Sequence, residues 1–150
     1  MTKSLEAKEE FSLGLNCSQA VLSQYAEQYD LDIETACKLA TGFGGGMGRQ
    51  ANTCGALTSA YMVLGLEFGS ISSHEKDKKN NTYDKVKQIS KEFESIHGSC
   101  ECRGLLACDI STQAGQKQAR EQHLHEKKCP KFVESVVVIL DSMIEKNNRE

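Results

Sequence analysis

Apolar residues recur every three or four positions along most of this chain, and its one proline is Pro130. This spacing places apolar side chains on one face of an α-helix, whereas the alternation that is typical of a half-buried strand is nearly absent. The clearest helix is predicted at residues 129–146, where Pro130 suits the first turn and an apolar stripe follows. The pattern therefore predicts an all-α fold, a multi-helix bundle.

The helical pattern breaks in two places. One break is a glycine-rich loop at residues 42–48, and the other is a polar stretch at residues 70–82, which we expect to be a solvated loop because it holds little apolar surface. The other predicted helices cover residues 4–13, 17–29, 33–41, 54–68, 83–96, 101–107 and 112–123. A chain of 150 residues has the usual size of one globular unit, so we expect residues 1–150 to form a single helical domain.

The charges of the chain argue against several classes of partner. There are 18 Lys and Arg against 21 Asp and Glu, and the two signs are mixed along the chain, which argues against binding to nucleic acid or to an anionic membrane. No apolar stretch is long enough for a membrane span, and residues 1–11 are polar and acidic, unlike a secretory signal. We therefore expect a cytoplasmic protein without membrane insertion.

The cysteines are the feature that says most about function. Seven of the 150 residues are Cys, and a domain of this length needs no cross-links in order to fold, because it buries about 68–70% of its unfolded surface. In a reducing compartment such a set is more often reactive or metal-binding than a disulfide framework. The chain lacks Cys-x-x-Cys, so neither a thioredoxin-like motif nor a compact zinc ribbon is present.

Two of the cysteines follow residues that typically cap helices. Cys17 follows Asn16, and Gln19 comes three residues after Asn16, which is the spacing of a capping box. Cys54 follows Thr53, a favourable cap, at the exit of the glycine-rich loop. Both cysteines are therefore predicted in the first turn of a helix, where unpaired backbone N–H groups and the helix dipole lower the pKa of a thiol.

Two further cysteines are also predicted at helix starts. Ser99 can cap a short helix whose first turn contains Cys102. Cys129 directly precedes Pro130, which makes it the cap or the last loop residue of the final helix. Four cysteines are thus predicted at four helix starts, and redox or metal chemistry explains this recurrence better than four independent buried residues.

The remaining cysteines and the glycine-rich loop have simpler interpretations. Cys37 is predicted to be a small core residue, whereas Cys100 and Cys108 are compatible with a local disulfide, a ligand role or burial. The loop matches neither Gly-x-Gly-x-x-Gly nor the P-loop motif. We expect it to bring the backbone close to Cys54 and to leave that sulfur accessible.

Several short motifs, in a fixed order, are similar to those of one protein family. They are Asn16-Cys17-Ser18-Gln19-Ala20-Val21-Leu22, Gly42-Phe43-Gly44-Gly45-Gly46-Met47-Gly48, Thr53-Cys54-Gly55-Ala56, Gly65-Leu66-Glu67-Phe68-Gly69, Cys102-Arg103 with Leu105-Leu106, and Cys129-Pro130-Lys131-Phe132-Val133. As a set they resemble the C_GCAxxG_C_C family, whose suggested role is redox chemistry, and the resemblance covers nearly the whole chain.

The resemblance places the four defining cysteines of the family on Cys17, Cys54, Cys102 and Cys129. These are the same four residues that the capping pattern selects. The resemblance implies a redox role. One position departs from the family pattern, because Ser59 stands where the family has glycine, and we expect this change to alter the helix packing beside Cys54.

Two hypotheses use the same four cysteines. In the first, Cys17, Cys54, Cys102 and Cys129 carry out thiol–disulfide chemistry of the oxidoreductase type, with Cys54 as the nucleophile and one of the others as the resolving thiol. In the second, the four thiolates bind zinc or an iron–sulfur cluster, as an electron-transfer or structural module. A helical interaction module with incidental cysteines is a third interpretation. The sequence identifies neither a redox partner nor the oligomeric state.

Both chemical hypotheses require the four cysteines to be close together in the fold. We predict that their sulfurs share one pocket and that Cys37 lies outside it. We also predict that at least one pair approaches disulfide geometry, with Cα atoms about 4.4–6.8 Å apart.

Overall fold

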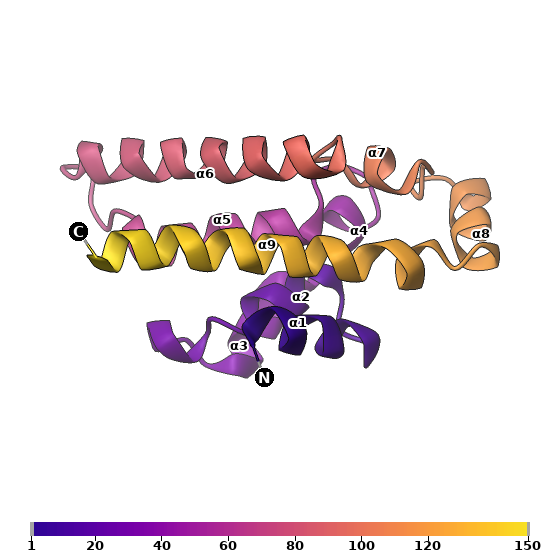
Figure 1. Cartoon of the computed structure of the whole chain (residues 1–150), viewed down its shortest axis with the longest axis horizontal. Helices are drawn as coiled ribbons and strands as arrows, with labels where there is room; N and C mark the ends of the chain where they lie inside the picture. The colour runs from indigo at the N-terminus through magenta and orange to yellow at the C-terminus, as the bar shows by residue number, and fades with distance from the viewer. Residues whose placement is uncertain (1, 150) are drawn as a thin grey trace.

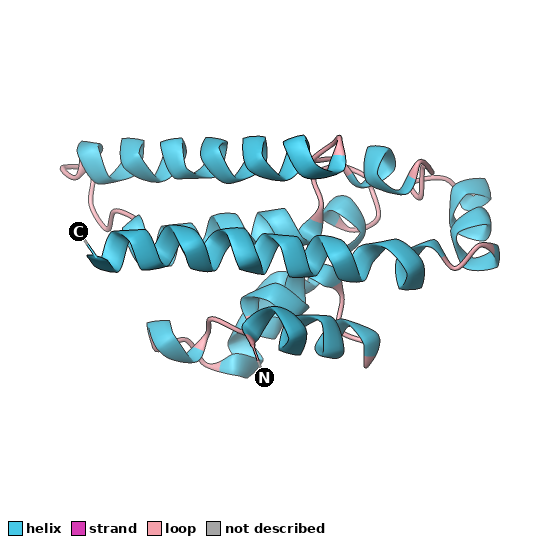
Figure 2. Cartoon of the chain, in the orientation of Figure 1, coloured by secondary structure: helices cyan, strands magenta, loops and turns pink. Residues whose placement is uncertain are grey.

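The computed structural model describes residues 2–149, and most of them are helical (Figure 2). The helices in chain order are α1 (Lys3–Ser12), α2 (Cys17–Leu22), the short 3-10 helix η1 (Glu27–Tyr29), α3 (Ile33–Thr41), α4 (Gly44–Met47), α5 (Gly55–Phe68), α6 (Lys76–His97), α7 (Cys102–Leu106), α8 (Gln113–Glu121) and α9 (Leu124–Arg149). The predicted all-α fold is confirmed. None of the helices within residues 2–149 is long and apolar enough to cross a membrane.

The long helices α5, α6 and α9 lie side by side and contact one another, as Figure 1 shows. Helix α1 packs on α9, and α2 packs on α5, so the amino-terminal helices cover one side of this group. The short helices α4 and α7 contact each other near the start of α5, and α8 caps that end of the molecule (Figure 1). The short elements therefore gather at one end of the bundle.

The core of the bundle follows the apolar stripe that the sequence predicts for the last helix. The stripe residues are all buried, and they are Phe132, Val133, Val136, Val137, Leu140, Met143 and Ile144. They pack against α1, α5 and α6, which bury residues such as Leu57, Leu64, Ile89 and Phe93. Tyr25 is also fully buried, and its hydroxyl donates a hydrogen bond of 2.6 Å to Asp141.

Three element boundaries differ from the sequence-based expectation. The predicted loop at residues 70–82 is wrong over most of its length, because α6 already begins at Lys76. Its polar side chains stay in solvent, and an ion pair of 2.8 Å between Lys78 and Glu75 supports its first turn. The predicted helix at residues 17–29 ends at Leu22 and is followed by turns and η1. Helix α9 begins at Leu124 rather than at Cys129, so Pro130 lies inside the helix.

Candidate functional site

A cavity of about 480 Å³ opens at the end of the bundle where the short elements meet. All four predicted cysteines line it: Cys17 from α2, Cys54 from the start of α5, Cys102 from α7 and Cys129 from α9. Cys37 is not among the lining residues, as predicted. The fold thus brings together four residues that are far apart in the sequence.

The amino-terminal turn of α2 holds Cys17 in place. The side chain of Asn16 accepts a hydrogen bond of 2.9 Å from the backbone N–H of Gln19, and Gln19 Oε1 accepts one of 3.1 Å from the N–H of Asn16. This is the capping box that the sequence predicts. Gln19 also donates to the Cys37 carbonyl of α3, at 3.2 Å. Cys17 is therefore fixed as the first residue of its helix.

Cys17 and Cys54 are in direct contact, and their environments differ. The thiol of Cys54 donates a hydrogen bond to Cys17, and the backbone N–H groups of Gly45, Gly55 and Ser18 donate to the same sulfur. These hydrogen bonds outweigh the effect of burial and lower the pKa of Cys17 to about 7. Cys17 therefore carries a large thiolate fraction at neutral pH.

Cys54, which the sequence favours as the nucleophile, has the less acidic environment of the two. Cys54 is the residue before α5 rather than part of its first turn, and it receives the N–H of Ala56. Its own proton makes the hydrogen bond to Cys17, and this bond, together with burial, raises the pKa of Cys54 well above its ordinary value. The sequence placed both cysteines at helix starts but did not reveal which one receives more N–H groups.

Cys102 and Cys129 are protonated thiols in the same cavity. Burial raises the pKa of Cys102 to about 12 and raises the pKa of Cys129 further. Cys102 is the first residue of α7, but Ser99 does not cap this helix, since its hydroxyl accepts the N–H of Glu101 instead. The prediction that Cys129 lies at a helix start is wrong.

A histidine that was not predicted as a site residue contacts one of the cysteines. His125 lies one helical turn before Cys129, and its Nδ1 is 3.7 Å from the Cys129 sulfur. Burial lowers the pKa of His125, so it is neutral at pH 7. Because both residues lie on α9, the spacing of four positions was the available signal, but it was not recognised while α9 was expected to start at Cys129.

A backbone junction fixes Cys54 relative to Cys102. The N–H of Cys54 donates to the Cys100 carbonyl at 2.9 Å, and the N–H of Cys102 donates to the Asn52 carbonyl at 2.6 Å. Thr53 and Glu101 form an isolated antiparallel bridge between these two bonds. The residues before α5 and those before α7 thus lie alongside each other.

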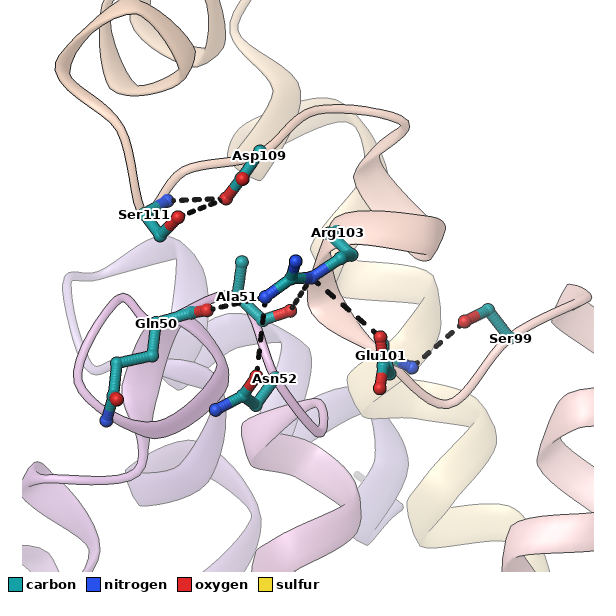
Figure 3. Close-up of polar contacts among 8 residues, drawn as sticks. All are labelled: Gln50, Ala51, Asn52, Ser99, Glu101, Arg103, Asp109 and Ser111. Carbon is teal, nitrogen blue, oxygen red and sulfur yellow. Dashed lines mark hydrogen bonds and ion pairs between the residues drawn. The ribbon is translucent and has the colours of Figure 1, made fainter.

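Arg103 reinforces this junction from the side (Figure 3). Its guanidinium donates to the carbonyl oxygens of Ala51 and Gln50, each at 3.1 Å, and to the side chain of Asn52 at 3.4 Å. Glu101 lies 3.8 Å from the same guanidinium. Three consecutive residues before Thr53 are therefore held by one side chain.

The glycine-rich segment makes room for the cysteines. Gly46 has a φ of +69°, and a Cβ built on it would lie 2.6 Å from Asn52 N and 2.8 Å from the Cβ of Cys102. Gly55 faces Cys17 in the same way, since its Cβ would lie 2.6 Å from the Cys17 sulfur. Both positions therefore require glycine.

The other three cysteines have separate surroundings. Cys108 is buried and donates to the Gly115 carbonyl at 3.2 Å, and Cys100 donates to the Ser90 carbonyl at 3.3 Å. Cys37 is half-buried on α3, so the prediction that it belongs to the core is wrong. All seven cysteines are free thiols.

The arrangement also bears on the metal hypothesis. Within residues 2–149, no three side chains of Cys, His, Asp or Glu are grouped so that they could hold a metal ion. The zinc or iron–sulfur alternative therefore finds no support in the geometry of the described residues.

Ser59, the position that departs from the family pattern, is buried between α2 and α5. Its hydroxyl donates to the Ser18 carbonyl at 2.6 Å and lies 2.6 Å from the Ser18 hydroxyl. Serine in place of glycine thus adds a hydrogen bond between the two helices that carry Cys17 and Cys54.

Comparison with known proteins assigns the chain to a family. No curated protein and no solved structure matches it. A family model described as "Putative redox-active protein (C_GCAxxG_C_C)" matches residues 15–143, a range that includes all four cavity cysteines. The chain therefore belongs to the C_GCAxxG_C_C family.

Proposed function

We propose that the protein is a thiol–disulfide redox protein in which Cys17 is the attacking thiolate and Cys54 the resolving thiol. The observation that carries this proposal is the direct contact between an acidic thiol and a protonated one inside a cavity. A thiolate is the nucleophile in thiol–disulfide exchange, and a pKa near the ambient pH is the most favourable for the attacking thiol. Cys17 meets this condition.

The reaction conserves atoms and electrons in two steps. The Cys17 thiolate forms a bond to one sulfur of a substrate disulfide, the substrate S–S bond breaks, and one substrate thiolate leaves. Cys54 then transfers its proton to that thiolate, attacks the Cys17 sulfur and expels the second substrate thiolate. The Cys17–Cys54 pair is oxidised to a disulfide, and the substrate disulfide is reduced by two electrons to one thiol and one thiolate, which takes up a proton from water.

Cys102 and Cys129 lie in the same cavity as protonated thiols. Burial, which is the larger cause, and the nearby Cys17 charge raise their pKa values. A dithiol reductant that reaches the cavity returns the Cys17–Cys54 disulfide to its starting state.

Alkylation with iodoacetamide across a pH series tests the assignment of roles. We expect Cys17 to react with an inflection near pH 7, because the rate follows the thiolate fraction as its pKa of about 7 is passed. In Cys54→Ala the inflection moves up toward the ordinary thiol value of about 8.5, because the strongest hydrogen bond to Cys17 is lost. Cys37→Ser is the matched control and leaves the inflection in place.

Mild oxidation followed by peptide mapping tests the pairing. The expected product is a disulfide between Cys17 and Cys54 in the wild type, and this product is absent from Cys17→Ser. The proposal is contradicted if Cys17 titrates like a free thiol, or if protein purified with reductant and without chelator holds zinc or iron on these cysteines.

A further inference from the structure

The cysteines of the site are recessed in the cavity, which restricts what can reach them. Only 6% of Cys54 and 8% of Cys102 are exposed, and Cys17 is half-buried against the backbone of Gly55. In thiol–disulfide exchange the attacking sulfur must approach along the S–S bond of the substrate. A disulfide held within the surface of a folded protein therefore fits this site less well than a small molecule that enters the cavity.

The cavity has the size and lining of a small-molecule site. Its volume of about 480 Å³ lies within the range of about 300–1,000 Å³ that is common for such sites. Much of the wall is apolar, and the side chains that form this part are Phe11, Leu105, Leu106, Ile110 and Phe132. An organic molecule with a short apolar body is complementary to this wall.

Arg49 gives the cavity its charge. It is the one permanently charged side chain among the described residues that line the cavity, and neither Asp nor Glu lines it. Arg49 is exposed, so it lies at the opening, and among residues 2–149 no carboxylate lies within ion-pair distance of it. Its stem packs over Gly45, where a Cβ would lie 2.9 Å from Arg49 Cγ, and Gly45 is one of the residues whose N–H donates to Cys17.

From this juxtaposition we infer that the substrate of the Cys17–Cys54 dithiol is a small organic disulfide that carries a carboxylate, with the carboxylate at Arg49 and the disulfide at Cys17. The inference rests on the function proposed above. Arg49 binds the carboxylate through its guanidinium, the apolar wall contacts the carbon chain, and Cys17 attacks the nearer sulfur. Exchange then follows the two steps given above, and two carboxylate-bearing thiols leave.

Three symmetric aliphatic disulfides that differ in charge provide the test. They are dithiodipropionate, which is anionic, hydroxyethyl disulfide, which is neutral, and cystamine, which is cationic. Formation of the Cys17–Cys54 disulfide in the reduced full-length protein is followed by mass spectrometry, and each rate is divided by the rate of the same reagent with the amide of N-acetylcysteine, which lacks a carboxylate. We expect the corrected rates to fall in the order anionic, neutral, cationic.

Arg49→Gln measures the contribution of the cation. We expect it to lower the ratio of the anionic to the cationic rate about fivefold, the upper end for an exposed ion pair. Arg120→Gln is the matched control, because it removes the same charge from α8, outside the cavity, and the ratio should stay at its wild-type value. A polyethylene glycol chain carrying the anionic disulfide should react much more slowly than the free reagent.

The outcomes separate the inference from the proposed function. If all reagents form the Cys17–Cys54 disulfide with equal corrected rates, if Arg49→Gln leaves the ratio unchanged, or if the polymer-bound reagent reacts as fast as the free one, the substrate class is wrong while the dithiol function stands. If no reagent forms that disulfide, the proposed function fails and the inference fails with it.

Discussion

The two ends of this molecule are held together in different ways. At one end the carboxyl-terminal half of α9 packs along α5 and α6 through side chains such as Val137 and Leu140, which are fully buried. At the other end the cysteine cavity is formed by short helices and by backbone segments joined through N–H and carbonyl groups. Side-chain packing therefore supplies most of the stability, whereas the placement of the backbone sets the chemistry of the thiols.

Removing a large side chain from the packed end should have the largest effect. We expect Leu140→Ala to lower the free energy of unfolding by about 2–5 kcal/mol, because it leaves a cavity among fully buried neighbours. Urea denaturation measures this loss. The pKa of Cys17, measured by alkylation of the folded protein, should stay near 7.

Val138 provides the control on the same helix. Its side chain is 56% exposed, so Val138→Ala should change the free energy of unfolding by no more than about 0.5 kcal/mol. The distinction between the two ends breaks down if Leu140→Ala shifts the pKa of Cys17 as strongly as a substitution beside the cavity does.

Substitution of Gly46 tests the backbone at the cavity end and should have the next largest effect. Gly46→Ala places an alanine in the left-handed conformation, which costs about 1–2 kcal/mol. Its Cβ would also lie 2.6 Å from Asn52 N. Gly98→Ala is the matched control, because Gly98 has a φ of +87° and nothing within 4 Å. We expect Gly46→Ala to lower the free energy of unfolding about twice as much as Gly98→Ala. Equal losses would mean that the contact with Asn52 does not matter.

The packed end could be predicted from the sequence because its structure follows the helical period. The stripe from Phe132 to Ile144 was identified, and the bounds of α3 were predicted correctly. The polar start of α6 was not predicted, since surface helices rich in Lys and Asp resemble solvated loops in composition. The start of α9 was missed because Pro130 indicated a first turn, whereas the buried Leu124 begins the helix earlier.

The cavity end could be predicted only in part. Which four cysteines converge followed from the family resemblance, since the predicted cap was correct only for the helix of Cys17. The sequence did not indicate which of them is acidic, because the pKa values depend on the N–H groups of Gly45 and Gly55, which reach Cys17 from other segments. The role of Arg103 was also hidden, since its partners at residues 50–52 lie 51–53 positions away in the sequence. Such contacts arise from the fold and leave no periodic signal.

Substitution of Gly55 should change the pKa of Cys17 with little effect on the packing of α9 against α5 and α6. In Gly55→Ala the new Cβ would lie 2.6 Å from the Cys17 sulfur and 2.8 Å from the Phe43 carbonyl, so Cys17 must move away from its donors. We expect its pKa to rise toward about 8.5 and its alkylation rate at pH 7 to fall several-fold. Gly65→Ala, on the same helix with nothing within 4 Å, should leave both unchanged. An unchanged rate in Gly55→Ala would contradict the proposed fit.

The smallest effect is expected at Arg103, where the backbone junction is held by a half-exposed side chain. Arg103→Lys keeps the charge but cannot reach Gln50, Ala51 and Asn52 together, because a lysine lacks the planar fork of donors. Since 46% of the Arg103 side chain is exposed, water replaces some of the lost hydrogen bonds. The free energy of unfolding should therefore fall by only about 0.5–1 kcal/mol.

The local effect should be clearer than the global one. The amide protons of Cys102 and Arg103, which bond to the carbonyls of Asn52 and Ala51, should exchange faster with solvent in Arg103→Lys, whereas those of α6 should not. Arg120→Lys serves as the control on α8 and should leave both sets unchanged. Arg103 holds residues 50–52 and not Cys54, which is the donor to Cys17 that belongs to the junction, so the pKa of Cys17 should stay near 7 even as the junction loosens. A rise in that pKa would show instead that the junction and the Cys17 donors move as one unit.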